Sequence, residues 1–246
     1  MNEASPHSPV SADQAIYYHN DVFGSQILVQ ILEPWLGHRV LEVGAGVGHI
    51  TTELARHCRE VVALEPTPDL YHQLHGRTEA LSNVTCHRQT LDEFGTASAQ
   101  QTTGTNDPKF DTVVYINVLE HINDHIGELS RARAFLNPGG RVLIVVPAHQ
   151  WLYSKVDRLT GHFRRYSKQS LGAAIQTSGL RTAAMKFFDS VGLIPYLVIY
   201  RWLQSSATEG TNAVIYSRVI LPLSHVLYKL SRGRLIGKNL VAVATV

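Results

Sequence analysis

The sequence predicts a single domain of the α/β class, built on a mostly parallel, doubly wound sheet of seven strands. Between residues 37 and 187, short apolar runs alternate with segments of helical periodicity. This alternation is typical of parallel strands joined by crossover helices. A chain of 246 residues fits one such domain. Apolar residues make up 44% of the chain and charged residues 17%, which is ordinary for a globular protein.

The first 36 residues precede this alternation. Residues 1–11 are rich in Ser, Pro and Ala and are expected to be disordered. Residues 12–36 are predicted to form one or two helices, because apolar residues recur there at helical spacing: Ile27, Leu28, Ile31, Leu32 and Trp35. We expect these N-terminal helices to pack ahead of the main fold and to act as a lid.

The alternating region predicts the next elements in order. Strands are predicted at residues 39–43, 60–64, 83–87, 109–116, 141–146 and 180–187. Helices are predicted at residues 47–59, 67–75, 124–136 and 168–178. The segment Gly95–Pro108 has almost no apolar residues, so a surface loop or disordered insertion without an assigned role is expected there.

The stretch 188–237 contains two strongly apolar segments, residues 191–203 and 213–230. Each includes a proline and an arginine, and neither offers the roughly 18 uninterrupted apolar residues of a membrane span. A helical cap is expected, either over an apolar pocket or as a dimer face, so the protein is a monomer or a homodimer. Attachment to a membrane surface is the less favoured alternative. Residues 238–246 supply the last strand.

Composition argues against several classes of function. The net charge is only +2 and the basic residues are dispersed, which disfavours a nucleic-acid partner. Two cysteines, Cys58 and Cys86, and a first segment unlike a signal peptide suit a cytoplasmic protein. His121 and His125 have helical spacing, but no third ligand stands nearby in the sequence. No metal site is therefore predicted.

The strongest motif is the stretch VLEVGAGVGHIT, residues 40–51. A buried strand leads into Gly44, Gly46 and Gly48, and alternate glycines allow the backbone to turn sharply and approach a ligand closely. Dinucleotide-binding loops have the different spacing G-x-G-x-x-G. Glu42 would repel a pyrophosphate, whereas it suits a ligand with an ammonium and a sulfonium centre. S-adenosylmethionine is such a ligand.

The second predicted strand ends in VVALEP, which places Glu65 twenty-one residues beyond Gly44. An acidic side chain at about this distance accepts hydrogen bonds from the hydroxyls of a ribose. Nicotinamide-binding and adenosylmethionine-binding proteins share this feature, so it indicates an adenosine ligand of either kind. A nicotinamide oxidoreductase is disfavoured by Glu42 and by the glycine spacing.

From about Tyr18 to Lys186, the chain resembles the class I S-adenosylmethionine-dependent methyltransferases, which implies a Rossmann-like fold. The glycine stretch matches the first motif of that family, and VVALEP matches the second. Three further stretches match the ends of its third, fourth and fifth strands: NVTCHRQTLDEF at 83–94, FDTVVYINVLEHI at 110–122 and LNPGGRVLIVVPA at 136–148. The resemblance places the cofactor-binding core at residues 37–187.

The same resemblance implies a set of cofactor contacts: Tyr18, Glu42, Gly44, Ala45, Gly46, Gly48, Glu65, Pro66, Thr90, Leu91, Asn117, Val118 and Glu120. Tyr18 would lie over the cofactor if the first helix acts as a lid. Thr90 and Leu91 would contact the adenine, although Thr90 stands where relatives commonly carry an acidic residue. Asn117 and Val118 would contact the methionine part through the backbone.

A narrower resemblance covers LYSKVDRLTGHFRRYSKQSL, residues 152–171, which is similar to a bacterial subgroup of small-molecule methyltransferases with a G-H-x-R-R-Y segment. This loop would lie at the mouth of the site, where Arg164 or Arg165 could hold a carboxylate or phosphate of the acceptor. Alternatively, the arginines fasten the loop through ion pairs, with Asp157 as the natural partner. Tyr196 is also expected to contact the acceptor.

The leading hypothesis is a methyltransferase that acts on a small-molecule acceptor by in-line displacement at the sulfonium methyl group. If the acceptor must lose a proton, His121 and His162 are the candidate bases, with Tyr153 and Tyr166 as orienting groups. The fourth strand exits into NVLEH, unlike the Asn/Asp-Pro-Pro-aromatic run of many adenine and amide methyltransferases. Two alternatives remain open: ring closure of the aminobutyryl group with release of methylthioadenosine, and a catalytically silent S-adenosylmethionine-binding protein.

Overall fold

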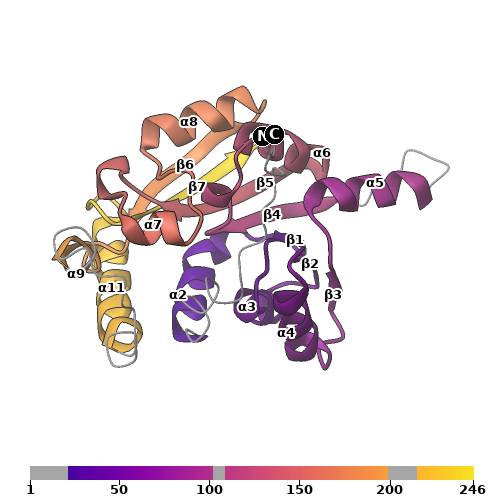
Figure 1. The fold of residues 1–246 in the computed structure, drawn as a ribbon, viewed down its shortest axis with the longest axis horizontal. Coiled ribbons are helices and arrows are strands. Elements are labelled where there is room, and N and C mark those ends of the chain that lie inside the picture. The colour runs from indigo at the N-terminus through magenta and orange to yellow at the C-terminus, as the bar shows by residue number, and fades with distance from the viewer. Residues whose placement is uncertain (1–21, 102–108, 199–214) are drawn as a thin grey trace, which may run out of the picture.

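A computed structural model describes residues 22–101, 109–198 and 215–246. Its centre is a seven-stranded sheet in the order β3-β2-β1-β4-β5-β7-β6 (Figure 1). The strands are β1 (Arg39–Val43), β2 (Glu60–Leu64), β3 (Val84–His87), β4 (Phe110–Ile116), β5 (Leu136–Pro147), β6 (Arg181–Phe188) and β7 (Asn239–Thr245). Strands β1 to β5 are parallel, and β7 runs antiparallel to both β5 and β6. The predicted mostly parallel, Rossmann-like α/β fold is confirmed.

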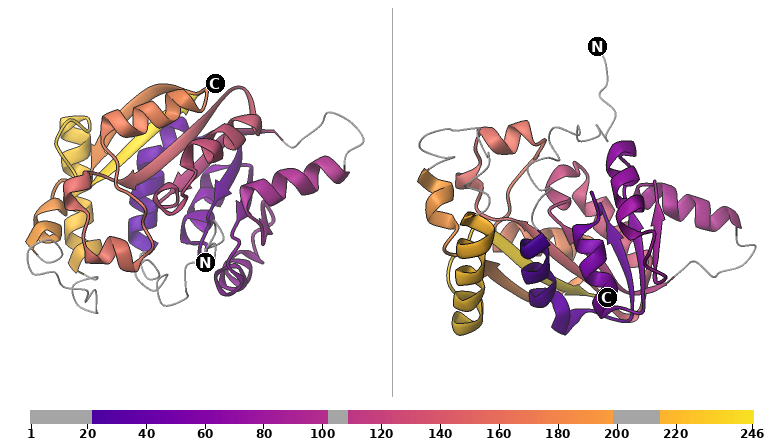
Figure 2. Two further views of the ribbon diagram at one scale, coloured as in Figure 1. Left: turned by 45° about the horizontal axis from the view of Figure 1, so that its top comes forward. Right: turned by 90° about the horizontal axis from the view of Figure 1, so that it is seen from below.

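Helices cover both faces of this sheet (Figures 1 and 2). One face carries α2 (Val22–Leu32), α3 (His49–His57), α4 (Pro68–Thr78) and α11 (Leu221–Ser231). The other carries α5 (Leu91–Gln101), α6 (His125–Ala134) and α8 (Lys168–Thr177). The shorter elements are α7 (Lys155–Leu159), α9 (Leu193–Tyr196), η2 (Glu33–Trp35), η3 (Leu119–His121), η4 (Gln150–Leu152) and η6 (Tyr216–Ile220).

Alternation of side chains along each strand builds one core on each face of the sheet. In β1, Val40 belongs to the core under α2 and α3, whereas Leu41 belongs to the core under α5, α6 and α8; both side chains are fully buried. The central strands are therefore apolar on both faces, as a parallel sheet covered on both sides requires. This packing holds the strand ends, and the loops that follow them, in fixed positions.

The segment Gly95–Pro108 differs most from its prediction. Residues 95–101 form the second half of α5, so the expected loop or insertion is wrong for this part. At the helix start, the Glu93 carboxylate accepts a hydrogen bond from the Thr90 backbone N–H at 2.8 Å, and the Thr90 hydroxyl accepts one from the Glu93 N–H at 3.3 Å. This reciprocal capping box starts a helix that has little apolar periodicity. Residues 102–108 lie outside the described residues.

Other boundaries differ from the predictions by a few residues. Strand β5 begins at Leu136, which pairs with Phe110 ahead of a shift in register, and the preceding helix α6 accordingly ends at Ala134. Helix α3 begins at His49 because Gly48, with a φ of +86°, still has a left-handed conformation.

The structure describes only part of the predicted lid and cap. Helix α2 packs against α3 and α11 on the face of the sheet. The predicted disordered residues 1–11, Tyr18 and residues 199–214 lie outside the described residues. The outer face of η6 and α11 exposes apolar side chains: Val219, Leu223, Val226 and Leu230. Among the residues described, no helix has the length and apolar character to cross a bilayer. The dimer face, the pocket roof and the surface attachment stay predictions.

Candidate active site

The candidate site lies at the carboxyl ends of the parallel strands, where open α/β sheets bind ligands. Gly44 follows β1, Glu65 follows β2 and Asn117 follows β4. Val43, the last residue of β1, pairs with Leu64 of β2 and with Tyr115 of β4. The three loops therefore begin side by side, and the residues predicted to contact the cofactor meet at one edge of the sheet.

The glycine loop leaves open space beside Gly46. Gly44, Gly46 and Gly48 all have positive φ angles, of +72°, +58° and +86°. A Cβ atom at Gly44 would lie 2.6 Å from Cγ2 of Val118, and one at Gly48 would lie 2.7 Å from Cδ1 of Leu74. At Gly46, by contrast, no atom of the described residues lies within 4 Å of that position. Gly44 and Gly48 thus allow close packing, whereas Gly46 borders a space that a ligand can fill.

Glu65 holds this loop from the end of β2. Its side chain is almost fully buried. One carboxylate oxygen accepts a hydrogen bond from the Gly46 N–H at 2.8 Å, and the other accepts one from the Thr67 N–H at 2.9 Å. A carboxylate has about four acceptor positions, so Glu65 can still accept hydrogen bonds from the two hydroxyls of a ribose. Its position fits the predicted role in binding an adenosine.

Glu65→Ala is expected to weaken binding of S-adenosylmethionine by about 1–3 kcal/mol, because charge-assisted hydrogen bonds to the ribose are lost. The dissociation constant can be measured by titration calorimetry. Glu60→Ala is a matched control, because Glu60 lies at the opposite end of β2 and pairs with Arg39. Equal affinities of the Glu65→Ala protein and the wild type would contradict the ribose assignment.

Glu42 is a buried acid beside the glycine loop. The Thr51 hydroxyl donates a hydrogen bond to its carboxylate at 2.6 Å. Burial raises the pKa of Glu42 to about 8; the bond from Thr51 opposes this rise, and the nearby charge of Glu65 adds to it. A cationic ligand would offset the cost of a buried negative charge here. The pair of buried acids, Glu42 and Glu65, therefore suits a ligand with a sulfonium centre and a ribose.

Because its pKa is raised, Glu42 is expected to lower the stability of the ligand-free fold at high pH. Because the folded protein holds this proton more tightly than the unfolded chain, the contribution of Glu42 to stability is fully present below about pH 4.5 and is lost as the pH rises to about 8. Glu42→Gln should therefore raise the free energy of unfolding above pH 8 by a few kcal/mol and weaken cofactor binding. Urea unfolding at pH 5, 7 and 9 tests this; parallel stability curves for the two proteins would contradict it.

The chain leaves β4 through a short segment that touches the glycine loop. Asn117 has a φ of +54°, a conformation that asparagine tolerates better than most residues. Val118 follows and packs against Gly44. The turn η3 then buries Glu120 completely and half-buries His121. The predicted cofactor contacts Asn117, Val118 and Glu120 thus follow β4, and Val118 among them touches the glycine loop.

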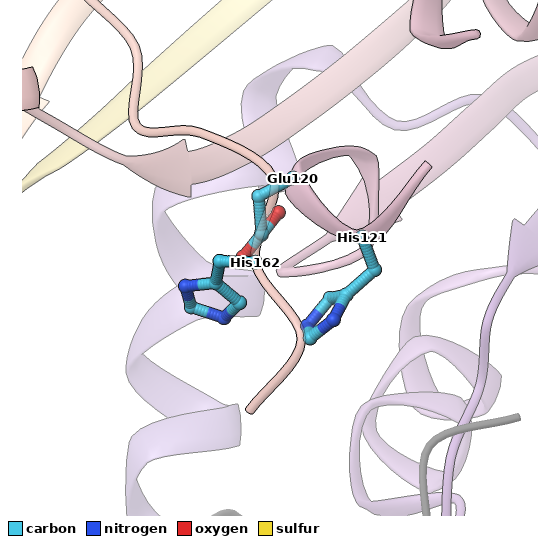
Figure 3. Close-up of side chains that lie close together, drawn as sticks. All are labelled: Glu120, His121 and His162. Atoms are coloured by element: carbon cyan, nitrogen blue, oxygen red, sulfur yellow. The ribbon is translucent and has the colours of Figure 1, made fainter. Parts of the chain in front are cut away.

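His162 joins Glu120 and His121 from a distant part of the sequence. We call these three residues the Glu-His-His group. Their side chains are turned toward one another (Figure 3), and one ligand-type atom from each lies within 4.8 Å of the other two. The two imidazole rings meet edge to face with centroids 4.5 Å apart. Burial raises the pKa of Glu120 to about 7 and lowers the pKa of His121 to about 3.

The segment containing G-H-x-R-R-Y is fastened to the exit of β4. The Phe163 N–H donates to the Glu120 carbonyl at 2.9 Å. The Arg164 guanidinium donates to the carbonyls of Ile122 and Asn123 at 2.6 and 3.0 Å. The Tyr166 hydroxyl donates to the Leu119 carbonyl at 3.2 Å. These bonds explain how two segments about forty residues apart come to share one site.

Asp157 organises the interior of the same segment. Its carboxylate is 1% exposed and accepts hydrogen bonds from His162 Nδ1 and Arg165 Nε, each at 2.8 Å. The Tyr196 hydroxyl and the Ser154 N–H also donate to it. Burial alone would raise the pKa of Asp157, but the bond from His162 and the charge of Arg165 hold that pKa well below its usual value. Arg165 therefore forms the ion pair with Asp157. In the sequence analysis, this pair is the alternative to binding of a carboxylate or phosphate of the acceptor.

The remaining predicted residues have the following positions. Tyr153 donates its hydroxyl hydrogen bond to the His162 carbonyl at 2.6 Å, and Tyr196 also bonds Arg165. Pro66 is exposed after β2, and Thr90 caps α5. The Leu91 side chain is buried in the core. A contact of Leu91 with adenine would therefore come from its backbone. Ala45 is buried in the glycine loop, and its N–H donates to the Leu64 carbonyl.

Sequence reasoning did not find that Asp157 orients His162. The two residues are only five apart, and Ser154 and Asp157 form the capping box of α7, which is a signal that local sequence carries. The sequence argument against a metal site was also incomplete. It rested on the lack of a third ligand near His121 and His125, whereas the fold supplies His162 to His121.

Residues 22–184 match the protein family described as "Methyltransferase domain", which accounts for more than half of the chain. The chain belongs to this family. The sequence prediction of a methyltransferase with S-adenosylmethionine as its cofactor is thereby confirmed, and the space beside Gly46 and the two buried acids fit that cofactor. The resemblance to the subgroup with the G-H-x-R-R-Y segment stays a prediction.

Curated relatives of this methyltransferase include ubiquinone biosynthesis O-methyltransferases. The enzyme from Xanthomonas oryzae pv. oryzae strain PXO99A is 27% identical over 195 residues, which cover 74% of this chain and 76% of the relative. The enzyme from Xanthomonas campestris pv. campestris strain B100 is 26% identical over 172 residues, which cover 64% of this chain and 66% of the relative.

Solved structures show the same fold. A SAM-dependent methyltransferase from Archaeoglobus fulgidus aligns with a TM-score of 0.59 and 18% identity, over 90% of this chain and 92% of the other. The 1,6-didemethyltoxoflavin-N1-methyltransferase of Burkholderia thailandensis, solved with 1,6-didemethyltoxoflavin and S-adenosylhomocysteine, aligns with a TM-score of 0.56 and 16% identity, over 100% of this chain and 92% of the other.

Proposed function

We propose that this methyltransferase transfers the methyl group of S-adenosylmethionine to a hydroxyl oxygen of a small molecule. One observation carries the proposal: Glu120 and His121 come together with His162 shortly after Val118, the residue beyond β4 that packs against Gly44 of the glycine loop. A hydroxyl must lose its proton as it attacks the methyl group. Side chains that can take up this proton near the reacting oxygen assist the loss. The relatives named O-methyltransferases support an oxygen acceptor.

The chain's own residues would divide the work as follows. S-adenosylmethionine supplies a methyl group already activated by the sulfonium charge. Glu65 would accept the hydrogen bonds of the ribose, and buried Glu42 would favour the positive charge nearby. Asn117 and Val118 would position the methionine part against the glycine loop. Alignment of this kind contributes much of the rate of a displacement reaction, because the reacting atoms are held in line.

The Glu-His-His group would face the acceptor hydroxyl and promote loss of its proton. His162 is oriented for this by its bond to Asp157, and Tyr153 and Tyr166 fasten the backbone of the segments that carry the group. Arg165 is buried and paired with Asp157, and Arg164 bonds two carbonyls. The proposal therefore does not require an anionic group on the acceptor.

Product analysis tests the proposal. The protein is incubated with S-adenosylmethionine and a panel of phenols, catechols, aliphatic alcohols and amines, and the products are separated by mass. The proposal predicts S-adenosylhomocysteine together with an acceptor methylated on oxygen. Release of methylthioadenosine would instead support ring closure of the aminobutyryl group. Tight cofactor binding without turnover of any acceptor would support a silent binding protein, and methylation of amines alone would contradict the oxygen acceptor.

A further inference from the structure

We propose that Glu120, His121 and His162 together bind a divalent transition-metal cation, with Zn²⁺ as the best match. The group brings one carboxylate and two imidazoles to a common point (Figure 3). Three protein ligands with coordination positions left open are typical of catalytic zinc sites, including those built from two histidines and a glutamate.

The separations within the group suit a single ion. Zn²⁺ binds imidazole nitrogen and carboxylate oxygen at about 2.0–2.2 Å. In a tetrahedral site, ligand atoms at this distance from the ion are about 3.3–3.6 Å apart. The three ligand atoms lie within 4.8 Å of one another, so side-chain shifts of up to about an ångström bring all three into the first coordination shell.

Four polar atoms of the group have no hydrogen-bond partner among the described residues. Neither carboxylate oxygen of Glu120 makes a hydrogen bond of normal geometry with any described residue, and the same holds for His121 Nδ1 and His162 Nε2. Glu120 is fully buried and His162 is 7% exposed. Buried polar groups without partners are rare in proteins because each costs free energy. A shared cation would satisfy all of these atoms at once.

The surroundings of His162 match those of a metal ligand. Histidine ligands usually donate the hydrogen of their second ring nitrogen to a carboxylate, which fixes the tautomer and directs the free lone pair at the ion. Nδ1 of His162 lies 2.8 Å from Oδ1 of Asp157, so Nε2 is left facing Glu120 and His121. Asp157 is itself held by Arg165, Ser154 and Tyr196.

The donor set selects among cations. Imidazole nitrogen suits Zn²⁺ and the neighbouring first-row metals, whereas Mg²⁺ and Ca²⁺ prefer sites made entirely of oxygen ligands. Two imidazoles and one carboxylate leave a net charge of +1 on the complex with a divalent ion. Methyl transfer changes no oxidation state, so a metal without redox chemistry is sufficient. These points favour Zn²⁺, with Co²⁺ as a spectroscopic substitute.

The cation would give the proposed function a means to activate its acceptor, and this step rests on that function. A hydroxyl that coordinates a divalent ion has a lower pKa, because the ion stabilises the oxygen anion. The proton passes to solvent. The oxygen then forms a bond to the methyl carbon, while the bond from that carbon to sulfur breaks and its electron pair stays with S-adenosylhomocysteine. The open coordination positions would admit one hydroxyl, or both hydroxyls of a vicinal diol.

Metal binding can be tested without cofactor or acceptor. Protein treated with a chelator is titrated with Zn²⁺ in a calorimeter, and Co²⁺ is added separately to record its visible absorption. We expect one ion per chain and Co²⁺ bands of a site with nitrogen and oxygen ligands. Glu120→Gln and His162→Asn should each lower Zn²⁺ affinity at least 100-fold, while the exposed His72→Gln should leave it unchanged. Binding that is absent in the wild type, or equal in the variants, would overturn the proposal.

Further measurements distinguish a failure of the proposed metal site from two other outcomes. These are misfolding of the variants and failure of the proposed function. S-adenosylhomocysteine affinity should stay within about threefold of the wild type in His162→Asn, which shows that the cofactor loop is intact, and both variants should keep the circular dichroism spectrum of the wild type. Asp157→Asn should weaken Zn²⁺ binding about 10- to 100-fold, as loss of an orienting carboxylate does. If oxygen methylation proceeds at full rate in metal-free protein, the proposed function stands and the metal proposal fails. If stoichiometric Zn²⁺ binds but no oxygen is methylated, the metal proposal stands and the proposed function fails.

Discussion

Replacement of Gly46 by valine is expected to abolish binding of S-adenosylmethionine, with at least a 100-fold rise in the dissociation constant. A side chain at Gly46 would project into the open space that the cofactor is proposed to fill. The φ of +58° adds strain, because a left-handed conformation costs a residue other than glycine roughly 1–2 kcal/mol. Titration calorimetry with S-adenosylhomocysteine measures the affinity.

Two controls show that the loss comes from the site and not from unfolding. Gly76→Val introduces the same side chain on the exposed surface of α4, where no atom from the described parts of the chain lies within 4 Å of the new Cβ. This variant should bind the cofactor normally. Circular dichroism should show native helix content for both variants. Wild-type affinity in a folded Gly46→Val protein would mean that the cofactor lies elsewhere.

Glu120→Gln is expected to lower kcat by a factor of at least 100. The loss follows from removal of the carboxylate that assists departure of the acceptor proton; contributions of this kind are about 10²- to 10⁴-fold. Because Glu120 is buried and its oxygens make no hydrogen bond with the described residues, the amide should also leave the melting temperature of the metal-free protein equal or higher.

This combination separates a role in the reaction from a role in the fold. A purely structural glutamate would lower the melting temperature when it is replaced and would leave kcat of the folded fraction unchanged. Glu79→Gln, at the exposed end of α4, is a control that should alter neither quantity. Wild-type turnover by Glu120→Gln, with any acceptor found, would remove Glu120 from the proposed mechanism.

The sequence could place the proposed cofactor residues at one edge of the sheet because its signals are local. The strand, the three glycines and the preceding Glu42 lie within a few residues of one another, and Glu65 stands at a fixed distance along the chain. Parallel strands bring the loops that follow them to one edge of the sheet, regardless of which distant segments pack beside those loops. The predicted fold class follows from the same alternation of strands and helices.

The acceptor side was less accessible to sequence reasoning because it is assembled from distant segments. His162 meets His121 because one backbone N–H and two side chains of residues 163–166 donate hydrogen bonds to carbonyls of residues 119–122. No periodicity connects two segments about forty residues apart. The same argument applies to Arg165, whose two possible roles could not be separated until its guanidinium was seen beside Asp157.

The sequence also contained signals that were simply local and strong, such as the capping box of Thr90 and Glu93 that starts α5. Apolar periodicity is weak there because only part of that helix faces the core, through Leu91 and Phe94. Polar helices of this kind are better recognised from their caps than from their faces.

A crystal structure with bound S-adenosylhomocysteine tests the central claim most directly. We expect the ribose hydroxyls within hydrogen-bond distance of the Glu65 carboxylate, the backbone of Gly46 against the ligand, and the sulfur directed at the Glu-His-His group. A ligand bound away from the ends of β1 and β2, or one whose sulfur faces away from Glu120, would contradict the account.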